Sequence, residues 1–391
     1  PLRAARMTAP TRALRHSGRG YIARMRMALI RWWTLGSVAM LAACAGEPRA
    51  PTRTPESIQA EIQSLIPPSV PQGAAWAVDL QLVFAALKIE PSRSNVCAVL
   101  AVTEQESTFN PDPPVPNLGK VAREEIMRRA DAAGVPQLAV SLALQLRSPD
   151  GRSWDERLAA VRTERELSLM YEQFIADVPL GEHLLARHNP VRTAGPMQVS
   201  IDFAQAHVQT RPYPFPAEES LRHEIFTRRG GLYFGTAHLL DYPAPSYGDE
   251  LIFRFADFNA GRWASRNAAF QQALATASNR KLDLDGDLFI AGAAGAANPG
   301  QTESAARSLA TTLGMNEREI RRELELSRGA EFDASPLLAS VFVLAEQRSG
   351  RTQPRALIPR IVLQSPKITR RLTTEWFARR VEERWKRCMQ R

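Results

Sequence analysis

The sequence lacks the short motifs that mark several large enzyme classes. It has no Gly-x-Ser-x-Gly nucleophile elbow, no phosphate-binding P-loop and no dinucleotide-binding glycine fingerprint. Only six histidines are present, and the pair His183 and His188 is spaced i, i+5, so the two rings would diverge on a helix. We therefore expect no α/β-hydrolase or nucleotide-dependent chemistry, no bound metal and no cofactor.

Few segments alternate between apolar and polar residues, as the half-buried strands of a sheet would. Most apolar residues instead recur at helical spacing, which predicts an all-α fold. With 391 residues, of which 44% are hydrophobic, the chain is long enough to bury one sizeable core, or one core with a smaller appended unit.

Acidic residues are absent from the first 43 positions, and the net charge is unevenly distributed. Residues 1–43 carry eight Arg, and residues 351–391 carry twelve Lys or Arg against three Glu. Subtracting these contributions of +8 and +9 from the total of +9 leaves about −8 for residues 44–350. Because that body contains no basic patch interleaved with aromatic residues, we exclude nucleic acid as a partner.

A short apolar run near the N-terminus indicates a secretion signal. Met25 or Met27 would begin a basic stretch, and the apolar residues 32–43 that follow are too few to span a bilayer. The alternative is a simple membrane-buried hydrophobic helix.

The sequence Leu-Ala-Ala-Cys at 41–44 resembles the bacterial lipoprotein box, in which the cysteine is acylated and becomes the mature N-terminus. The resemblance implies a signal peptide over 1–44 and a lipid anchor with palmitate on Cys44. Residues 45–55 are rich in Pro, Arg and Thr, which predicts a tether between the lipid and the domain. The resemblance also implies a lipoprotein of the bacterial cell envelope, anchored in the outer membrane and facing the periplasm. Two acyl chains would hold the protein stably at that membrane.

Segment 98–111 predicts an apolar helix that ends in acidic residues and is stopped by prolines. At about 100° per residue, Glu106 projects on the same side as Val99 and Val102, whereas Glu104 points to the opposite side. A carboxyl on the apolar side of a helix is poorly solvated, so its pKa should rise toward the range that a general acid requires. The alternative is a helix-end Glu that simply reaches water.

Two further motifs follow in the chain. Glu106 begins Glu-Ser-Thr-Phe-Asn-Pro, and Gly-Pro-Met-Gln (195–198) and Phe-Asn-Ala-Gly (258–261) come after it in that order. Together they resemble the three-motif signature of the lytic transglycosylases of the goose-type lysozyme-like superfamily. Residues 226–240 resemble the connecting helix of that family, and the whole chain also resembles a bacterial family of uncharacterised lipoproteins.

The resemblance implies a lysozyme-like enzyme that cleaves peptidoglycan between N-acetylmuramic acid and N-acetylglucosamine and leaves a 1,6-anhydro product. It assigns the acid and base roles to Glu106 without a second carboxylate, because the muramyl 6-hydroxyl is the nucleophile. Carried over position by position, the substrate-binding residues are Ser107, Gly195, Met197, Gln198, Phe258, Asn259 and Gly261.

The chain departs from the family pattern at several points. Pro196 stands where the family has Leu, and Phe258 where it has Tyr, which removes a hydroxyl that could orient the acid or the sugar. One such buried hydrogen bond is worth about 1 kcal/mol. Gly195 also lies 89 positions after Glu106 (195 − 106), so an insertion separates the first two motifs.

These features predict a lysozyme-like domain over 56–280 with a helical insertion at about 118–190, and an additional helical C-terminal region over 281–391. Residues 291–300 are expected to form a loop. We expect helices at 56–65, 75–87, from about 94 to the proline run, 120–133, 136–146, 153–175, 302–313, 316–326, 335–347 and 367–389.

Two other functions stay open. A non-catalytic lipoprotein could keep a degenerate groove to bind peptidoglycan or a cell-wall partner. A lysozyme-like hydrolase would require a second carboxylate across the groove, for which Asp257 is the reserve candidate.

Three smaller features are also interpreted from the sequence alone. Cys97 and Cys388 could form a disulfide, although Cys97 in an apolar helix is more typical of a packing residue. The acidic residues of 281–287 are spaced unlike an EF-hand loop, which favours a polar turn over a calcium site. The basic C-terminal helix is expected to dock on the domain, with attraction to an anionic envelope surface or glycan as the alternative.

Overall fold

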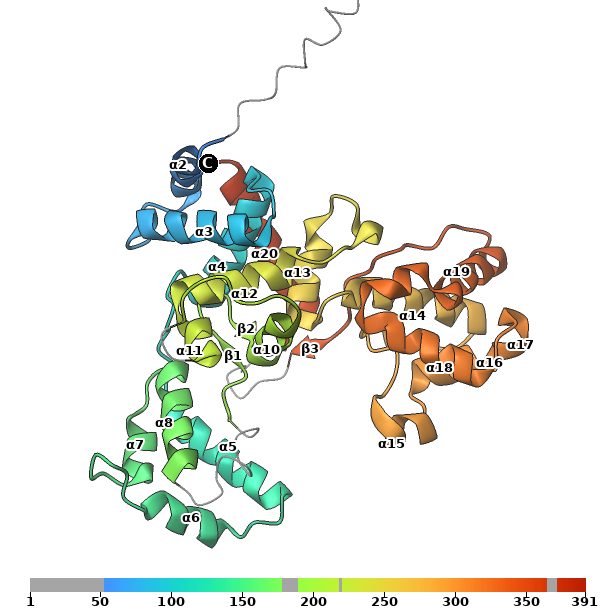
Figure 1. Cartoon of the computed structure of the whole chain (residues 1–391). Coiled ribbons are helices and arrows are strands. Elements are labelled where there is room, and N and C mark those ends of the chain that lie inside the picture. The colour runs from blue at the N-terminus through green and yellow to red at the C-terminus, as the bar shows by residue number, and fades with distance from the viewer. Residues whose placement is uncertain (1–52, 178–188, 218–219, 364–370) are drawn as a thin grey trace, which may run out of the picture. The chain divides into compact units, whose positions relative to one another are not determined.

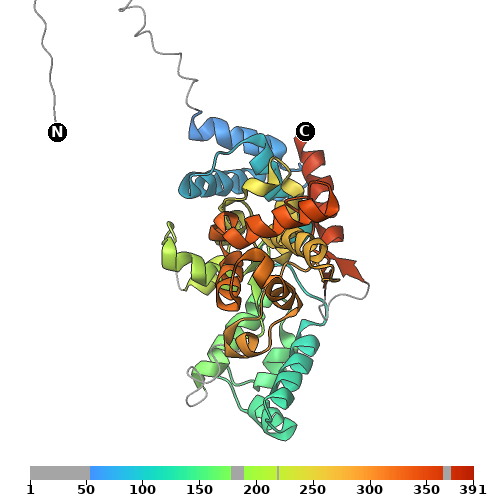
Figure 2. The same cartoon turned by 90° about the vertical axis from the view of Figure 1, so that its right-hand side faces the viewer.

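The computed structural model describes residues 53–177, 189–217, 220–363 and 371–391 (Figures 1 and 2). The expected signal peptide, the Cys44 anchor, nearly all of the tether and the pair His183 and His188 lie outside these residues. From Pro55 onward the chain forms one unit.

The described residues are predominantly helical, which confirms the predicted all-α class. The first helices are α2 (Pro55–Leu65), α3 (Gly73–Leu87), α4 (Arg93–Ser107), α5 (Leu118–Ala132), α6 (Gln137–Gln145), α7 (Trp154–Ala160), α8 (Glu164–Asp177), α10 (Ile201–Thr210), α11 (Leu221–Phe226), α12 (Arg228–Leu240) and α13 (Leu251–Ala260). They are followed by α14 (Ala264–Ser278), α15 (Gly292–Ala297), α16 (Gln301–Ser308), α17 (Ala310–Leu313), α18 (Glu317–Glu325), α19 (Pro336–Ser349) and α20 (Thr374–Met389).

Short extended and 3-10 segments connect these helices. The strands β1 (Thr193–Ala194) and β2 (Val199–Ser200) form an antiparallel pair, as do β3 (Val362–Leu363) and β4 (Leu372–Thr373). The 3-10 turns are η2 (Pro245–Tyr247), η3 (Leu326–Arg328) and η4 (Ala330–Ala334).

Several predicted helix boundaries were wrong. The helix expected at 153–175 is divided into α7 and α8, because Val161 is extended and Thr163 bridges to Pro114. The helix expected at 302–313 is interrupted at Leu309, and the loop expected at 291–300 contains α15.

The two helices that matter most for the site also differ at their starts. Helix α4 was expected to begin at about 94, but Ser92 is its N-cap, and the Ser92 side chain accepts a hydrogen bond from the Asn95 backbone N–H at 3.2 Å. The C-terminal helix begins at Thr374 rather than at 367, because the residues just before it pair with β3 and Thr373 caps the helix.

Helix α4 lies at the centre of the main core. Every residue from Val96 to Thr103 is buried, so the helix is covered on all sides, as its nearly continuous apolar run requires. It packs against α20 and α12 in the larger core cluster, to which α3 and α13 also contribute (Figure 1). The last helix of the chain therefore completes the environment of the helix that carries Glu106.

A second cluster lies farther along the chain. Helices α14, α16, α18 and α19 bury a separate apolar set that includes Phe270, Phe332 and Val341. The predicted division at 281 stays a prediction, but α14 precedes it and contributes to this second cluster, whereas α20 belongs to the first.

The described part of the insertion is helical. Helices α5, α6, α7 and α8 contact one another in sequence, and Trp154 and Leu158 of α7 are buried among them. Nowhere in the described ranges does a helix have both the length and the apolarity needed to cross a bilayer.

Candidate functional site

The end of α4 is a sharp turn with unusual backbone geometry. Thr108 and Phe109 directly follow the helix and both have left-handed φ angles, 52° and 60°. Each such residue costs about 1 kcal/mol or more when it is not glycine. Phe109 is buried edge-on against Trp76 of α3, with ring centroids 5.5 Å apart, and this contact holds the turn in place.

Glu106 lies in the last turn of α4, just before this bend. Its side chain is half-buried, and the described residues provide no hydrogen bond to its carboxylate. Burial raises the pKa of Glu106 from 4.5 to about 7, although the nearby Arg384 guanidinium of α20 opposes the rise. The carboxyl is therefore divided between its acid and base forms near neutral pH.

Glu104 has a different environment on the same helix. Its carboxylate forms ion pairs with Arg384 at 3.4 Å and Arg387 at 3.3 Å, both on α20. Glu104 is thus neutralised by the docked C-terminal helix, whereas Glu106 is isolated from such pairing. The structure confirms that these two neighbouring carboxylates have separate surroundings.

The second motif forms the turn of the β1–β2 hairpin. Gly195 has a φ of 74°, and a Cβ at this position would lie 2.2 Å from the Ile225 carbonyl oxygen, so only glycine fits there. Met197 is fully buried, and its side chain fills the space beside Gly235 of α12. The expectation that Met197 lines a glycan groove is therefore wrong, because the residue packs in the core and positions the hairpin.

Gln198 is half-buried, and its side-chain amide is bonded within the hairpin. Its Oε1 accepts a hydrogen bond from the Thr193 hydroxyl at 2.9 Å, and its Nε2 donates to the Gly195 carbonyl at 3.3 Å. The backbone φ of 50° at Gln198 shows that this turn is also strained. A sugar amide would have to compete with these internal bonds.

The remaining predicted site residues lie at two helix ends. Ser107 is buried, and its hydroxyl donates to the Thr103 carbonyl at 3.1 Å, so it stabilises α4. Phe258 lies edge-on to His238 with centroids 5.1 Å apart. Asn259 is exposed and accepts a hydrogen bond from the Thr374 hydroxyl at 2.9 Å, and Gly261 ends α13 with a φ of 104°.

Asp257, the reserve candidate for a second carboxylate, has a structural role. It is buried and accepts hydrogen bonds from the Tyr242 hydroxyl (3.1 Å), the Tyr247 hydroxyl (2.5 Å) and the Ser265 backbone N–H (2.7 Å). Burial raises its pKa, and these donors oppose the rise. With both oxygens occupied inside the core, Asp257 is not placed to activate a water or attack a sugar.

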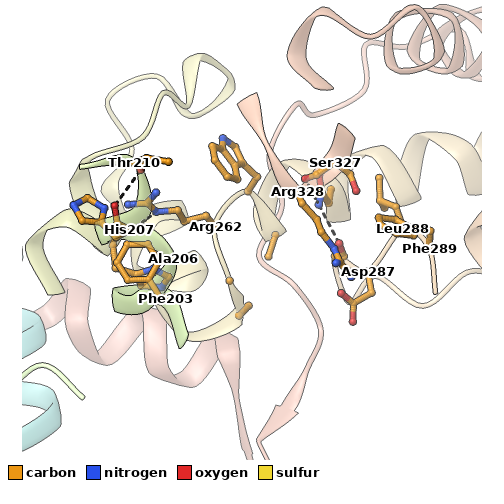
Figure 3. A pocket seen from close by; sticks show the side chains of 17 residues that line it. Phe203, Ala206, His207, Thr210, Arg262, Asp287, Leu288, Phe289, Ser327 and Arg328 are labelled. Carbon is orange, nitrogen blue, oxygen red and sulfur yellow. Dashed lines mark hydrogen bonds between the residues drawn. The ribbon is translucent and has the colours of Figure 1, made fainter. Parts of the chain in front are cut away.

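All three motif segments lie against one helix. Helix α12 contacts α4, β2 and α13, and these segments share the larger core cluster. The segment 226–240, which resembles the connecting helix of the family, contains α12, and its equivalence to that helix stays a prediction. The motifs are therefore gathered on one core. They do not share one cavity: of the predicted site residues, Gly261 lines the cavity shown in Figure 3, and Glu106 and the others do not.

Two contributors to this region were missed from the sequence. Arg384 lies 278 positions after Glu106 (384 − 106), and nothing in the local pattern showed that the basic C-terminal helix would pack beside α4. Arg262 directly follows the third motif, Phe-Asn-Ala-Gly. A basic residue next to a predicted site motif could have indicated a role for Arg262 in this region.

The acidic turn at 281–287 is held by side-chain amides. The Gln271 amide donates to Asp285 at 2.8 Å and accepts from the Gly286 backbone N–H at 2.9 Å, while the Gln301 amide donates to Asp283. This confirms a polar turn. Across the part of the chain that the structure describes, His, Cys, Asp and Glu do not form a group of three or more that could hold a metal ion.

Comparison with known proteins gives two matches. Residues 69–391 match the family model described as "Protein of unknown function (DUF1615)". The chain is also 48% identical over 359 residues to a protein of Escherichia coli (strain K12) described as "Uncharacterized protein YaiW", covering 91% of this chain and 97% of that protein. No solved structure matches the chain.

Proposed function

The chain belongs to the DUF1615 family of proteins of unknown function, and we propose that this member is a peptidoglycan lytic transglycosylase. Glu106 would protonate the glycosidic oxygen between N-acetylmuramic acid and N-acetylglucosamine. The resulting carboxylate would then accept the proton of the muramyl 6-hydroxyl as that oxygen bonds to C1 of the same sugar. The products are a 1,6-anhydro end and a free 4-hydroxyl, with no water consumed.

The observation that carries this proposal is the environment of Glu106. A group that serves first as acid and then as base works best when its pKa lies near the working pH. Burial brings the pKa of Glu106 to about 7, while Glu104, two residues away, is held in ion pairs. The strained turn at Thr108 and Phe109 adds support, since strained backbone of this kind is concentrated at functional sites.

The lipoprotein box near the N-terminus supports a cellular location for this activity. A lipid on Cys44 and a tether over 45–55 would hold the domain at the periplasmic face of the outer membrane, within reach of peptidoglycan strands. The single-carboxylate mechanism fits the surroundings of Glu106, because Asp257, the acid considered for a hydrolase, is occupied by three donors. We therefore favour lyase over hydrolase chemistry.

A second candidate function is a non-catalytic lipoprotein that binds peptidoglycan or a cell-wall partner. Three observations favour it: the Gln198 amide is bonded within its own hairpin, Met197 is buried, and Phe258 lacks the hydroxyl of the family residue. This protein would retain sacculi without releasing fragments from them.

The deciding experiment compares Glu106→Gln with the wild-type protein on purified sacculi, with the soluble products identified by mass spectrometry. We expect anhydro-muropeptides from the wild type and a loss of about 100-fold or more in Glu106→Gln, the usual size of a lost acid–base contribution. Glu104→Gln is the matched control, because it makes the same change on the same helix and should retain the activity.

Three outcomes separate the candidates. Equal release of anhydro products by Glu106→Gln would contradict the assignment. Reducing ends in place of anhydro ends would indicate a hydrolase. Sacculus binding without release by the wild type, unchanged in Glu106→Gln, would favour the non-catalytic lipoprotein.

A further inference from the structure

A cavity of about 510 Å³ lies between α10 and the segments that follow α13, and Figure 3 shows its two walls. Phe203 and His207 of α10 line one wall together with Arg262. Asp287, Phe289 and Arg328 line the other. The volume is typical of sites for small organic molecules.

Arg262 is a half-buried cation on the first wall. Its guanidinium stacks on the rings of Phe203 (4.6 Å) and Tyr242 (5.0 Å), and it donates hydrogen bonds to the backbone carbonyls of Ala237 and His238. These bonds use Nε and one Nη2 hydrogen, so Nη1 and the other Nη2 hydrogen keep their donor capacity.

Within the described ranges, no carboxylate lies within the 4.0 Å that would make an ion pair with Arg262. The charge of Asp241 acts on Arg262, but Asp241 is itself paired with Arg211 at 2.7 Å. Burial lowers the pKa of Arg262 to about 10, and it therefore remains a cation at neutral pH. A desolvated cation without a counter-ion is costly, so a bound anion would relieve that cost.

The second wall carries one cation and one anion, Arg328 and Asp287. The Arg328 guanidinium lies 4.7 Å from the Phe289 ring centroid. Burial and the charge of Asp285 raise the pKa of Asp287, and the charge of Arg328 opposes the rise. Burial lowers the pKa of His207, and that of His238 to about 3, so both rings are neutral at pH 7. The side chains lining the cavity thus carry two cations and one anion, a net charge of +1.

We propose that this cavity binds a small carboxylate-bearing ligand, with the carboxylate on Arg262 and the rest of the molecule extending toward Asp287 and Arg328. A monoanion matches the net charge, whereas a phosphate with a charge of about −1.5 at pH 7 would overcompensate it. The planar donor fork of arginine suits a carboxylate. The inference does not depend on the chemistry at Glu106, which does not line this cavity.

Calorimetric titration of the full chain tests the proposal with four probes. N-acetylmuramic acid and N-acetyl-D-alanyl-D-alanine are monoanions that carry a carboxylate on a sugar and on a peptide, N-acetylglucosamine is a neutral sugar, and inorganic phosphate is an inorganic anion. We expect at least one carboxylate probe to bind at least about tenfold more tightly than the neutral sugar or phosphate, as expected for one charge-assisted hydrogen bond. The better carboxylate probe then identifies the source.

Two pairs of variants locate the site. Arg262→Gln should weaken binding by about tenfold or more, whereas Arg254→Gln should not, although Arg254 also stacks on Tyr242 (4.6 Å) and donates to backbone carbonyls. Arg254 does not line the cavity.

A second pair guards against misfolding of Arg262→Gln. Ala206 is exposed and lines the cavity, so Ala206→Glu would place a competing carboxylate there without removing a buried contact. Gln205→Glu adds the same charge one position away, outside the lining. Loss of carboxylate binding in Ala206→Glu alone supports the site. Three results would overturn the proposal: equal carboxylate binding by Ala206→Glu and Gln205→Glu, tighter binding of phosphate than of the carboxylate probes, or no binding of either carboxylate probe by the wild type.

Discussion

Cys97 of α4 is disulfide-bonded to Cys388 of α20, 291 positions away, with Cα atoms 5.5 Å apart. Both cysteines are buried, so the preference for Cys97 as a simple packing residue was incomplete: it packs in the core and also cross-links it. The bond joins the helix that carries Glu106 to the helix that carries Arg384. It therefore fixes the two elements that set the charge environment of the proposed acid.

Replacing both cysteines with Ser should destabilise the protein by about 2–5 kcal/mol, because the bond closes a very long loop in the unfolded chain. Thermal unfolding with and without a reductant measures the effect. The double variant should be insensitive to reductant and should match the reduced wild-type protein. A wild-type midpoint that does not change on complete reduction would contradict the stabilising role.

The stability of the protein should depend on pH through Glu106. Its pKa is about 7 in the folded state against 4.5 in the reference state, so the folded protein binds more protons between these values. The free energy of unfolding therefore falls as pH rises from 4.5 to 7. After a discount for partial exposure, Glu106→Gln should be more stable than wild type by about 1–2 kcal/mol at pH 8 and equally stable at pH 4. Denaturant unfolding at both pH values checks this, and a gain of equal size at both would refute a titration effect.

Removing the charge of Arg384 should raise the pKa of Glu106 above its wild-type value, since this guanidinium favours the carboxylate form. Carbon NMR titration of the Glu side chains in Arg384→Gln measures the shift. Arg380→Gln is the matched control, because Arg380 lies one turn earlier on α20 and pairs with Glu383 at the surface. A similar shift in both variants would mean that the overall charge of the helix acts, rather than Arg384.

Gly195→Ala should destabilise the hairpin of the second motif by about 2–5 kcal/mol, from backbone strain and the clash with the Ile225 carbonyl together. Gly134→Ala separates the two causes. Gly134 has nearly the same φ, 73° against 74°, but no atom within 4 Å of the added Cβ, so it should lose about 1 kcal/mol. Chemical denaturation of the two variants gives the difference, which is the cost of the clash.

The local parts of the fold could be predicted from the sequence. The apolar run before Glu106 predicted α4 and the poor solvation of Glu106, because helical periodicity and burial are both encoded within a few turns. The helices of the insertion were also recognised, apart from the break at Val161, where the chain bridges to Pro114–Val115.

The missed parts depend on contacts between distant segments. The Asp257 carboxylate accepts hydrogen bonds from the hydroxyls of Tyr242 and Tyr247 and from the backbone N–H of Ser265. The spacing of these residues in the sequence does not predict that their donors would meet at Asp257. Met197 was expected in a groove because its motif suggested one. It is in the core because Gly235 of α12 leaves room for it, a fit that only tertiary packing reveals.

The packing of α20 on α4 has a consequence for biogenesis. During synthesis the apolar surface of Val96–Val102 emerges long before α20, the helix that packs on it. Cys388 of α20 lies 291 residues after its disulfide partner Cys97. A vectorially emerging chain must keep that surface from aggregating until the final helix arrives. A nonsense mutation that removes only α20 would therefore remove Arg384 and expose the face of α4 that α20 covers, although the contacts of α4 with α12 and α2 would remain.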